Sequence, residues 1–254
     1  MITLDAIRKT YRSGATSHAA IGNVSLTIGD GEFVSIVGPS GCGKSTLLNL
    51  IAGFIAPSAG EIRVKDQLVQ PGHVPSRLGY LFQKDVVLPW LTVEQNVGLG
   101  LRFAHMPAAQ IREKVSGLLK LANLRGYENY FPYQLSGGMR QRTALLMTLA
   151  CDPRVLLLDE PFGALDALTR EELSLELSRL WQELGRTALL ITHDIEEAIL
   201  LGDRVLIMSE RPGTIRADIA VDLPRPRNAE TVRLPRFQEI KNQVRDIIFN
   251  RAQA

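Results

Sequence analysis

A glycine-rich segment between a predicted strand and a predicted helix constrains the fold of this 254-residue chain most strongly. The apolar stretch Glu32–Val37 predicts the strand, and Gly38-Pro-Ser-Gly-Cys-Gly-Lys-Ser45 follows it directly. Apolar residues at helical spacing come next, from Leu47 to Ala52. The backbone N–H groups of such a loop and the N-terminus of the following helix both attract anions, which indicates a phosphate-binding site.

The segment fits the pattern Gly-x-x-x-x-Gly-Lys-Ser at every defined position. In that pattern the lysine, here Lys44, reaches the β- and γ-phosphates of ATP, and the hydroxyl of Ser45 binds Mg²⁺. The alternative is an ordinary glycine-rich turn that contains a lysine by chance. Within the loop, Cys42 is expected to contribute only its backbone N–H. The residues predicted to bind ATP are Gly38, Pro39, Ser40, Gly41, Cys42, Gly43, Lys44, Ser45 and Thr46.

Two adjacent carboxylates, Asp159 and Glu160, end the uninterrupted apolar run that starts at Val155. Open α/β sheets bind ligands at the carboxyl ends of their parallel strands, which is where this pair is expected. Asp159 is predicted to hold Mg²⁺, directly or through water, and Glu160 to polarise the attacking water. The alternative is a pair of solvated acids at a strand end.

Strands and helices alternate along most of the chain, which predicts an α/β core. Further buried strands are expected at Thr187–Thr192 and Arg204–Met208, and the first thirty or so residues are β-rich. The region from about Gln83 to Ala150 is instead helical, so a helical insert interrupts the core. Its predicted helices are Thr92–Phe103, Pro107–Leu124 and Gly137–Cys151, and a last helix is expected at Phe237–Phe249.

Composition excludes several classes of protein. The net charge of +2 gives no basic field for nucleic acid, so no nucleic-acid partner is expected. No apolar run reaches the roughly 18 residues of a membrane span, and no secretory signal is visible at the N-terminus. The 2 cysteines, Cys42 and Cys151, lack metal-ligand spacing and favour a reducing cytoplasm.

A second predicted helix start lies in the segment Leu135-Ser-Gly-Gly-Met-Arg-Gln-Arg142. A serine followed by two glycines at a helix N-terminus is a further anion-binding arrangement. One complete phosphate loop and two phosphate-binding helix starts in one chain indicate a site shared between two copies. The alternative is a flexible turn ahead of a helix.

With these motifs in place, the chain resembles the ATP-binding cassette (ABC) family over about residues 2–215. The matches occur in the family's order and form a highly specific set. They are Tyr11 (the aromatic that stacks on adenine), Gly38–Thr46 (phosphate loop), Gln83 (the glutamine after a core strand), Leu135–Gln141 (signature), Val155–Glu160 (Mg²⁺ and base segment), Ala164–Asp166 (inter-subunit loop) and His193 (switch histidine).

The resemblance implies roles that spacing alone does not. Gln83 would contact Mg²⁺ and the attacking water, and would transmit the nucleotide state to a membrane partner. His193 would contact the γ-phosphate and act with Glu160 and Lys44 in catalysis. The signature residues would bind the γ-phosphate held by the opposite subunit of a head-to-tail homodimer, and they are Ser136, Gly137, Gly138 and Gln141.

The resemblance also implies an architecture. We expect a P-loop NTPase core with a mainly parallel sheet, an N-terminal antiparallel β subdomain and an inserted helical subdomain at about 84–151. The nucleotide-binding domain would cover 1–222. The remaining residues, 223–254, would form a C-terminal tail that packs on the core, touches the membrane surface or regulates the protein.

Within the family, the chain is similar to the branch of transporter ATPases that serve nitrate, sulfonates, taurine and related small solutes. The segments that carry this similarity are Asp85–Asn96, Thr192–Ala198 and Met208–Gly213. The expected function is an ATPase that energises import through a separate integral membrane permease. A solute-binding protein would be an indirect partner, and the chain would lie on the cytoplasmic face of the inner membrane.

A coupling surface for the permease is expected near Gln83 and within 86–97. The apolar residues from Val87 to Leu91 would otherwise form an unusual exposed cluster, and they can receive a short helix of the permease. The alternative is that they form the core of the helical insert. Competing functions are a non-transport ABC ATPase acting on ribosomes or DNA, and a small-molecule kinase that leaves the signature helix unexplained.

Overall fold

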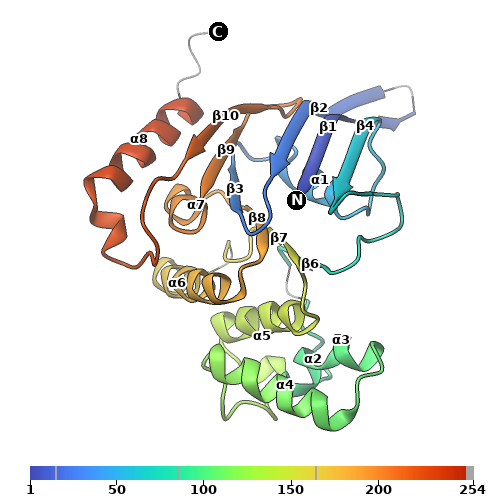
Figure 1. Cartoon of the computed structure of the whole chain (residues 1–254), viewed down its shortest axis with the longest axis vertical. Helices are drawn as coiled ribbons and strands as arrows, with labels where there is room; N and C mark the ends of the chain where they lie inside the picture. Colours follow the sequence, from blue (N-terminus) through green and yellow to red (C-terminus); the bar gives the residue numbers. More distant parts are fainter. Residues whose placement is uncertain (15, 85, 164, 250–254) are drawn as a thin grey trace.

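The computed structural model describes residues 1–14, 16–84, 86–163 and 165–249. Two β-sheets and the helices around them make up this part of the chain (Figure 1). The smaller sheet is antiparallel and has the strand order β2-β1-β4-β5. Its strands are β1 (Ile2–Ser13), β2 (Thr16–Ile28), β4 (Ala59–Val64) and β5 (Gln67–Leu68).

The larger sheet has the strand order β10-β9-β3-β8-β7-β6. All neighbours in it are parallel except β9 and β10. The core strands predicted at residues 32–37, 155–159, 187–192 and 204–208 are confirmed, and their ends differ by at most one residue. The strands are β3 (Phe33–Val37), β6 (Leu78–Leu81), β7 (Val155–Asp159), β8 (Thr187–Ile191), β9 (Arg204–Met208) and β10 (Ile215–Ala220).

Every residue of β3, β7 and β8 is buried, because both faces of the core sheet are covered. Helix α1 (Lys44–Ile51) packs between the two sheets and contacts β2, β4 and β7. Helices α6 (Ala167–Leu184) and α7 (Ile195–Leu201) cover the opposite face. Successive side chains of β7 point to opposite faces of the sheet, so Leu157 packs with α1 on one face and Leu156 and Leu158 pack with α6 on the other.

A group of helices lies below the core sheet in the view of Figure 1. The prediction of one helix over Thr92–Phe103 is wrong, because the helix is interrupted at Gly98. A Cβ at Gly98 would lie 3.0 Å from the Ile111 side chain, so the residue that weakens the helix also lets α4 pack closely. The group comprises α2 (Val93–Val97), α3 (Leu99–Phe103), α4 (Ala108–Leu121), the 3-10 turn η1 (Pro132–Gln134) and α5 (Gly137–Ala150).

The chain after β10 packs on the core as far as it is described. The turn η2 (Thr231–Arg233) leads into α8 (Pro235–Phe249), two residues earlier than the predicted start. Phe237, Ile240 and Val244 are buried against α7, β9 and β10. Residues 235–249 therefore pack on the core, which is one of the three possibilities raised for the tail.

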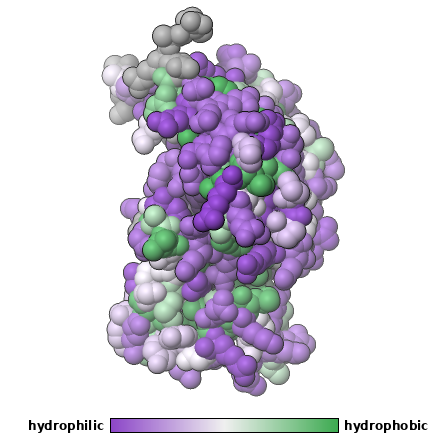
Figure 2. All heavy atoms as spheres, turned by 90° about the vertical axis from the view of Figure 1, so that its left-hand side faces the viewer, coloured by the Kyte–Doolittle hydropathy of each residue, from purple (hydrophilic) through white to green (hydrophobic). Residues whose placement is uncertain are grey.

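The face that carries α8 is mainly hydrophilic, with small separated hydrophobic areas (Figure 2). In the described part of the chain, we find no helix with the length and apolarity needed to cross a membrane.

Candidate functional site

Loops that follow neighbouring strands of the core sheet bring the predicted site residues to one edge. The phosphate loop follows β3, Asp159 ends β7, His193 follows β8, and Gln83 follows β6. Because these strands are parallel, their carboxyl ends share one edge of the sheet, where open α/β sheets bind ligands.

The phosphate loop holds its shape through glycine and through the lysine side chain. Gly43 has a φ of 111°, and a Cβ there would lie 2.8 Å from the Ala20 carbonyl, so only glycine fits. Lys44 is buried, and its Nζ donates to the carbonyls of Gly38 (2.9 Å) and Pro39 (3.0 Å). The lysine thus already lies inside the loop. Burial raises the pKa of the Cys42 thiol, and that side chain packs in the core.

Asp159 joins the phosphate loop to the end of β6. Its Oδ1 accepts from the Ser45 hydroxyl (2.9 Å), and the Tyr80 hydroxyl lies 3.3 Å from Oδ2 and 3.0 Å from Asn49 Oδ1. Burial raises the pKa of Asp159, while the hydrogen bonds from Ser45 and Tyr80 oppose that shift. Sequence reasoning missed Tyr80, whose only signal was its place three residues before Gln83.

Glu160, Gln83 and His193 form a second cluster beside Asp159. Gln83 Nε2 donates to Glu160 Oε2 (2.9 Å), and His193 Nδ1 lies 3.5 Å from the same oxygen. Glu160 has a φ of 45°, in the left-handed region that a non-glycine residue rarely occupies. Such strain gathers at functional sites, and here it comes directly after a fully buried strand.

The signature serine begins a helix as predicted. Ser136 is the N-cap of α5, and its Oγ accepts from the backbone N–H of Met139 (3.2 Å). A Cβ at Gly138 would lie 2.8 Å from Thr169 Cγ2, so the glycine lets α5 approach α6. Helix α5 lies with α2 to α4, whereas α1 lies between the two sheets (Figure 1).

Comparison with known proteins identifies the family. The sequence model described as ABC transporter matches residues 21–163. The chain belongs to the ABC transporter family. It is 41% identical over 252 residues to the nitrate import ATP-binding protein of Synechococcus elongatus, covering 97% of this chain and 91% of that protein. It is 50% identical over 196 residues to the taurine import ATP-binding protein of Yersinia pestis, covering 77% and 76%.

Solved structures agree with that assignment. A dimeric structure of the ATP-binding cassette MJ0796, in a post-hydrolysis state bound to ADP and Pi, matches with a TM-score of 0.77 and 35% identity. The match covers 88% of this chain and 100% of that chain. The protein is therefore an ABC ATPase, the ATP-binding subunit of a transporter, and its sheets and helices confirm the predicted fold class.

The remaining predicted site residues of this ABC ATPase lie outside the two clusters. Tyr11 on β1 is 44% exposed, and the Lys9 ammonium lies over its ring, 5.0 Å from the ring centre. Asp166 is the N-cap of α6 and accepts from the backbone N–H of Thr169 (3.0 Å). Ala164 of the predicted inter-subunit loop and Asp85 of the branch-specific segment lie outside the described residues.

The expected apolar surface from Val87 to Leu91 is only partly exposed. Val87 is buried in the core, which corrects the expectation that it belongs to an exposed cluster. Leu88 and Leu91 are half-buried, and Pro89 and Trp90 are exposed, Trp90 to 69%. Both alternatives raised from the sequence therefore hold in part.

The loop after β9, part of the branch-specific segment, packs against the phosphate loop. Arg211 Nε donates to the Gly41 carbonyl, and a Cβ at Gly213 would lie 2.2 Å from the Cys42 carbonyl. Gly213 also exchanges hydrogen bonds with residues of β2, donating to Ala20 and accepting from Gly22. The branch-specific segment Met208–Gly213 therefore packs against the phosphate loop at Gly41 and Cys42.

Glu197 on α7 is a buried carboxylate that is bonded to Thr192, the residue before His193. Its Oε2 accepts from the Thr192 hydroxyl, and its Oε1 has no hydrogen-bond partner among the described residues. Burial raises the pKa of Glu197 to about 7, and the charges of Asp194 and Glu160 add to the shift. The Thr192 hydrogen bond and the positive charge of Arg170 oppose it.

We expect the Glu197→Gln variant to be stabilised relative to the wild type more at pH 8 than at pH 5. The folded state holds a proton on Glu197 up to about pH 7, whereas the unfolded state releases it near 4.5. Stability from the protonated form is therefore lost as pH rises through that window, by up to ~3 kcal/mol. Thermal unfolding at both pH values measures the difference, and Glu171→Gln controls for loss of an exposed charge. An equal difference at pH 5 and pH 8 would contradict the assignment.

Proposed function

We propose that this ABC ATPase energises uptake of a small solute, such as nitrate, a sulfonate or taurine, through a separate membrane permease. The observation that carries the proposal is similarity to nitrate and taurine import ATP-binding proteins over most of the chain. The alignment with the nitrate import relative covers 97% of this chain, so it spans both the ATPase motifs and the branch-specific segments. No observation favours a non-transport ABC ATPase.

In this proposal the phosphate loop binds ATP and the Lys44 ammonium exchanges its two loop carbonyls for β- and γ-phosphate oxygens. The residues beside the loop fit Mg²⁺, because the Ser45 hydroxyl and an Asp159 carboxylate oxygen lie 2.9 Å apart. Gln83 is the third proposed ligand. When bound, Mg²⁺ would neutralise phosphate charge. The Tyr80 hydroxyl orients the Asp159 carboxylate, and Tyr11 stacks on adenine.

In this proposal the second cluster, formed by Glu160, Gln83 and His193, carries out the hydrolysis. Glu160 accepts a proton from the attacking water, and Gln83 orients both the carboxylate and the water. His193, whose Nδ1 lies 3.5 Å from Glu160 Oε2, contacts the γ-phosphate. The left-handed backbone at Glu160 holds the carboxylate toward its two partners, so little reorganisation is needed for reaction.

The second half of each ATP site comes from a second copy of the chain. The Ser136 hydroxyl and the N–H groups that open α5 bind the γ-phosphate held by the partner copy, with Gly137, Gly138 and Gln141 beside them. Asp166 faces the same interface. The dimeric state of the similar solved cassette supports this arrangement. ATP would stabilise the closed dimer, and phosphate release would open it.

Residues 84–151 form the proposed helical subdomain of a nucleotide-binding domain at 1–222, with 223–254 as a C-terminal tail. The permease docks on 86–97, beside Gln83, so that nucleotide state and permease conformation are linked. Trp90 is the anchor of this surface because a large aromatic side chain that is 69% exposed can fill a pocket of a partner. The ATPase would then lie on the cytoplasmic face of the membrane, and the permease would receive solute from a solute-binding protein.

We expect the wild-type chain to co-purify with a membrane permease and Trp90→Ala to lose most of that association. Removing an aromatic anchor from an interface costs at least ~2 kcal/mol, which weakens the affinity more than tenfold and so lowers the amount of permease retained. Quantitative affinity purification from detergent-solubilised membranes measures the permease retained per ATPase. Phe103→Ala, which removes another exposed aromatic, is the matched control. Equal retention by Trp90→Ala and the wild type would contradict the proposed docking site.

A further inference from the structure

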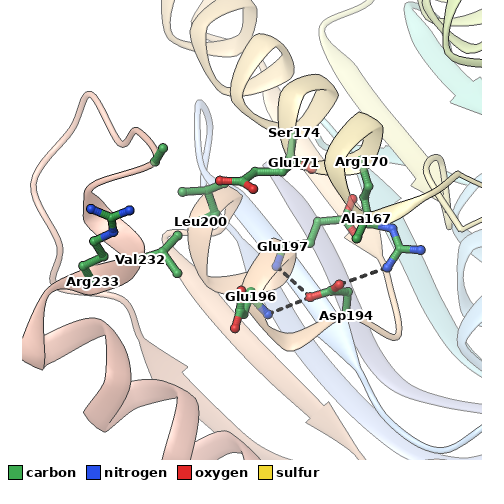
Figure 3. Close-up of a pocket in the computed structure, with 11 residues that line it drawn as sticks. Ala167, Arg170, Glu171, Ser174, Asp194, Glu196, Glu197, Leu200, Val232 and Arg233 are labelled. Carbon is green, nitrogen blue, oxygen red and sulfur yellow. Dashed lines mark hydrogen bonds and ion pairs between the residues drawn. The ribbon is translucent and has the colours of Figure 1, made fainter.

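Arg170, in the first turn of α6, donates hydrogen bonds to two separate loops. Its Nη1 donates to Asp194 Oδ2 (3.0 Å), in the loop after β8. Its Nε donates to the Phe162 carbonyl (3.3 Å) and its Nη2 to the Leu165 carbonyl (3.0 Å), both in the loop after β7. All three guanidinium nitrogens therefore have an assigned partner, and Figure 3 shows the pair with Asp194.

Helix stability does not account for this arginine. A cation in the first turn of a helix opposes the helix dipole, at a cost of about 0.3–1 kcal/mol. The N-terminus of α6 is already capped by Asp166. The hydrogen bonds of Arg170 to the two loops oppose this cost.

The Asp194 end of the pair is fixed to α7. Asp194 Oδ1 accepts from the backbone N–H groups of Glu196 (2.9 Å) and Glu197 (3.1 Å), shown as dashed lines in Figure 3. The backbone N–H of Asp194 donates to the Thr192 hydroxyl (3.0 Å). His193 is thus held between two anchored neighbours, and Arg170 is bonded to one of them.

The other end of the pair is fixed to the loop that leads from Glu160 to Asp166. Phe162 is buried in the core, and the loop turns through hydrogen bonds from Gly163 N–H to the Glu160 carbonyl and from Leu165 N–H to the Phe162 carbonyl. By holding the carbonyls of Phe162 and Leu165, Arg170 fixes the orientation of both turns.

Packing alone does not fix the ion pair. The Arg170 and Asp194 side chains are 21% and 29% exposed, and both line a cavity of about 320 Å³ between α6, α7 and the segment around η2 (Figure 3). Hydrogen bonds therefore determine where the guanidinium lies. An arginine is required because its planar fork can donate in several directions at once, which an ammonium cannot do with the same geometry.

We propose that Arg170 is a positioning residue that links the loop carrying Asp166 to the loop carrying His193. When the partner copy contacts the Asp166 loop, a displacement of that loop would be transmitted to His193 and Glu160 through the Arg170 guanidinium and Asp194. The inference rests on the proposed roles of Asp166 and His193, and it adds a residue that acts through the loops on which they lie.

ATP hydrolysis by the purified full-length chain tests the link. Arg170→Ala is expected to lower kcat about 10- to 100-fold, since misplaced catalytic groups cost this much, with KM for ATP changed less than about threefold. Arg170→Lys should stay closer to the alanine variant than to the wild type. Asp194→Asn keeps the helix cap but removes the charge, and combining it with Arg170→Ala should lower kcat no further. Arg179→Ala, an exposed arginine of the same helix, is the control.

The outcomes separate this link from the catalytic site itself. Unchanged kcat in Arg170→Ala, full rescue by lysine, or additive effects of the two substitutions would overturn the proposal. A parallel loss of ATP binding and melting temperature would also overturn it, because it would show a purely structural role. If His193→Ala leaves turnover unchanged, the proposed catalytic cluster fails instead, whatever Arg170→Ala does.

Discussion

Glu160→Gln is expected to lower ATP turnover by about 10²- to 10⁴-fold, the contribution of a general base. The glutamine has the same shape, and its Oε1 can accept the hydrogen bond that Glu160 Oε2 accepts from Gln83 Nε2 (2.9 Å). It cannot take a proton from water. The loss should therefore come from chemistry and not from collapse of the cluster with Gln83 and His193.

ATP binding should survive the Glu160→Gln change, because Lys44, Ser45 and the phosphate loop are untouched and a negative charge near the phosphates is removed. The variant should accumulate as an ATP-bound dimer. Phosphate release measures turnover, and size-exclusion chromatography with and without ATP measures the dimer. Glu172→Gln, which removes an exposed carboxylate of α6, is the control. Turnover retained by Glu160→Gln would exclude Glu160 as the base.

The local parts of the site could be predicted from the sequence because each depends on neighbouring residues. The phosphate loop can be predicted from a strand, a glycine-rich segment with its lysine, and a helix in direct succession. The N-cap of α5 can be predicted from the serine before Gly137 and Gly138. The carboxylates after an apolar run also lie at the predicted edge. In each case a pattern within about ten residues contains the cause.

The contacts between segments could not be predicted, because they depend on which strands become neighbours. Tyr80 reaches Asp159 only because β6 pairs with β7 in parallel, in a register that places Tyr80 opposite Leu157. The same holds for Arg211, whose phosphate-loop partner Gly41 lies 170 residues away in the sequence. Neither partner is visible in a local pattern.

Charge counts were equally uninformative about the segment before α8. Arg227 is buried, and its guanidinium donates to backbone carbonyls at the end of α7 and after β10, including Ile199 (2.8 Å) and Val221 (3.2 Å). Arg225 pairs with Asp203 (2.7 Å) and lies over the Trp181 ring. Arg225 and Arg227 therefore attach this segment to the end of α7 and to Asp203, and they do not contribute to a positively charged surface.

Ser136→Ala is expected to lower turnover by about 10²- to 10³-fold, as the loss of one hydrogen bond to a developing charge does, without weakening ATP binding to the monomer. The substitution also removes the α5 cap, where the Ser136 hydroxyl accepts from Met139 N–H (3.2 Å), at a cost of about 1 kcal/mol. Thermal unfolding measures that cost separately. Equilibrium binding of a fluorescent ATP analogue at low protein concentration measures the monomer.

Mixing two inactive variants decides whether Ser136 acts across the dimer. Ser136→Ala keeps its phosphate loop, and Lys44→Ala keeps its signature helix, so a mixed dimer contains one complete site and one doubly defective site. An equal mixture should recover up to roughly a quarter of wild-type turnover, because half of the dimers are mixed and each has one of two sites intact. Activity that stays at the level of the separate variants, together with lost ATP binding by the Ser136→Ala monomer, would place Ser136 in the site of its own chain. Recovery would show that each phosphate loop is completed by the α5 helix start of the partner, since neither variant holds both halves.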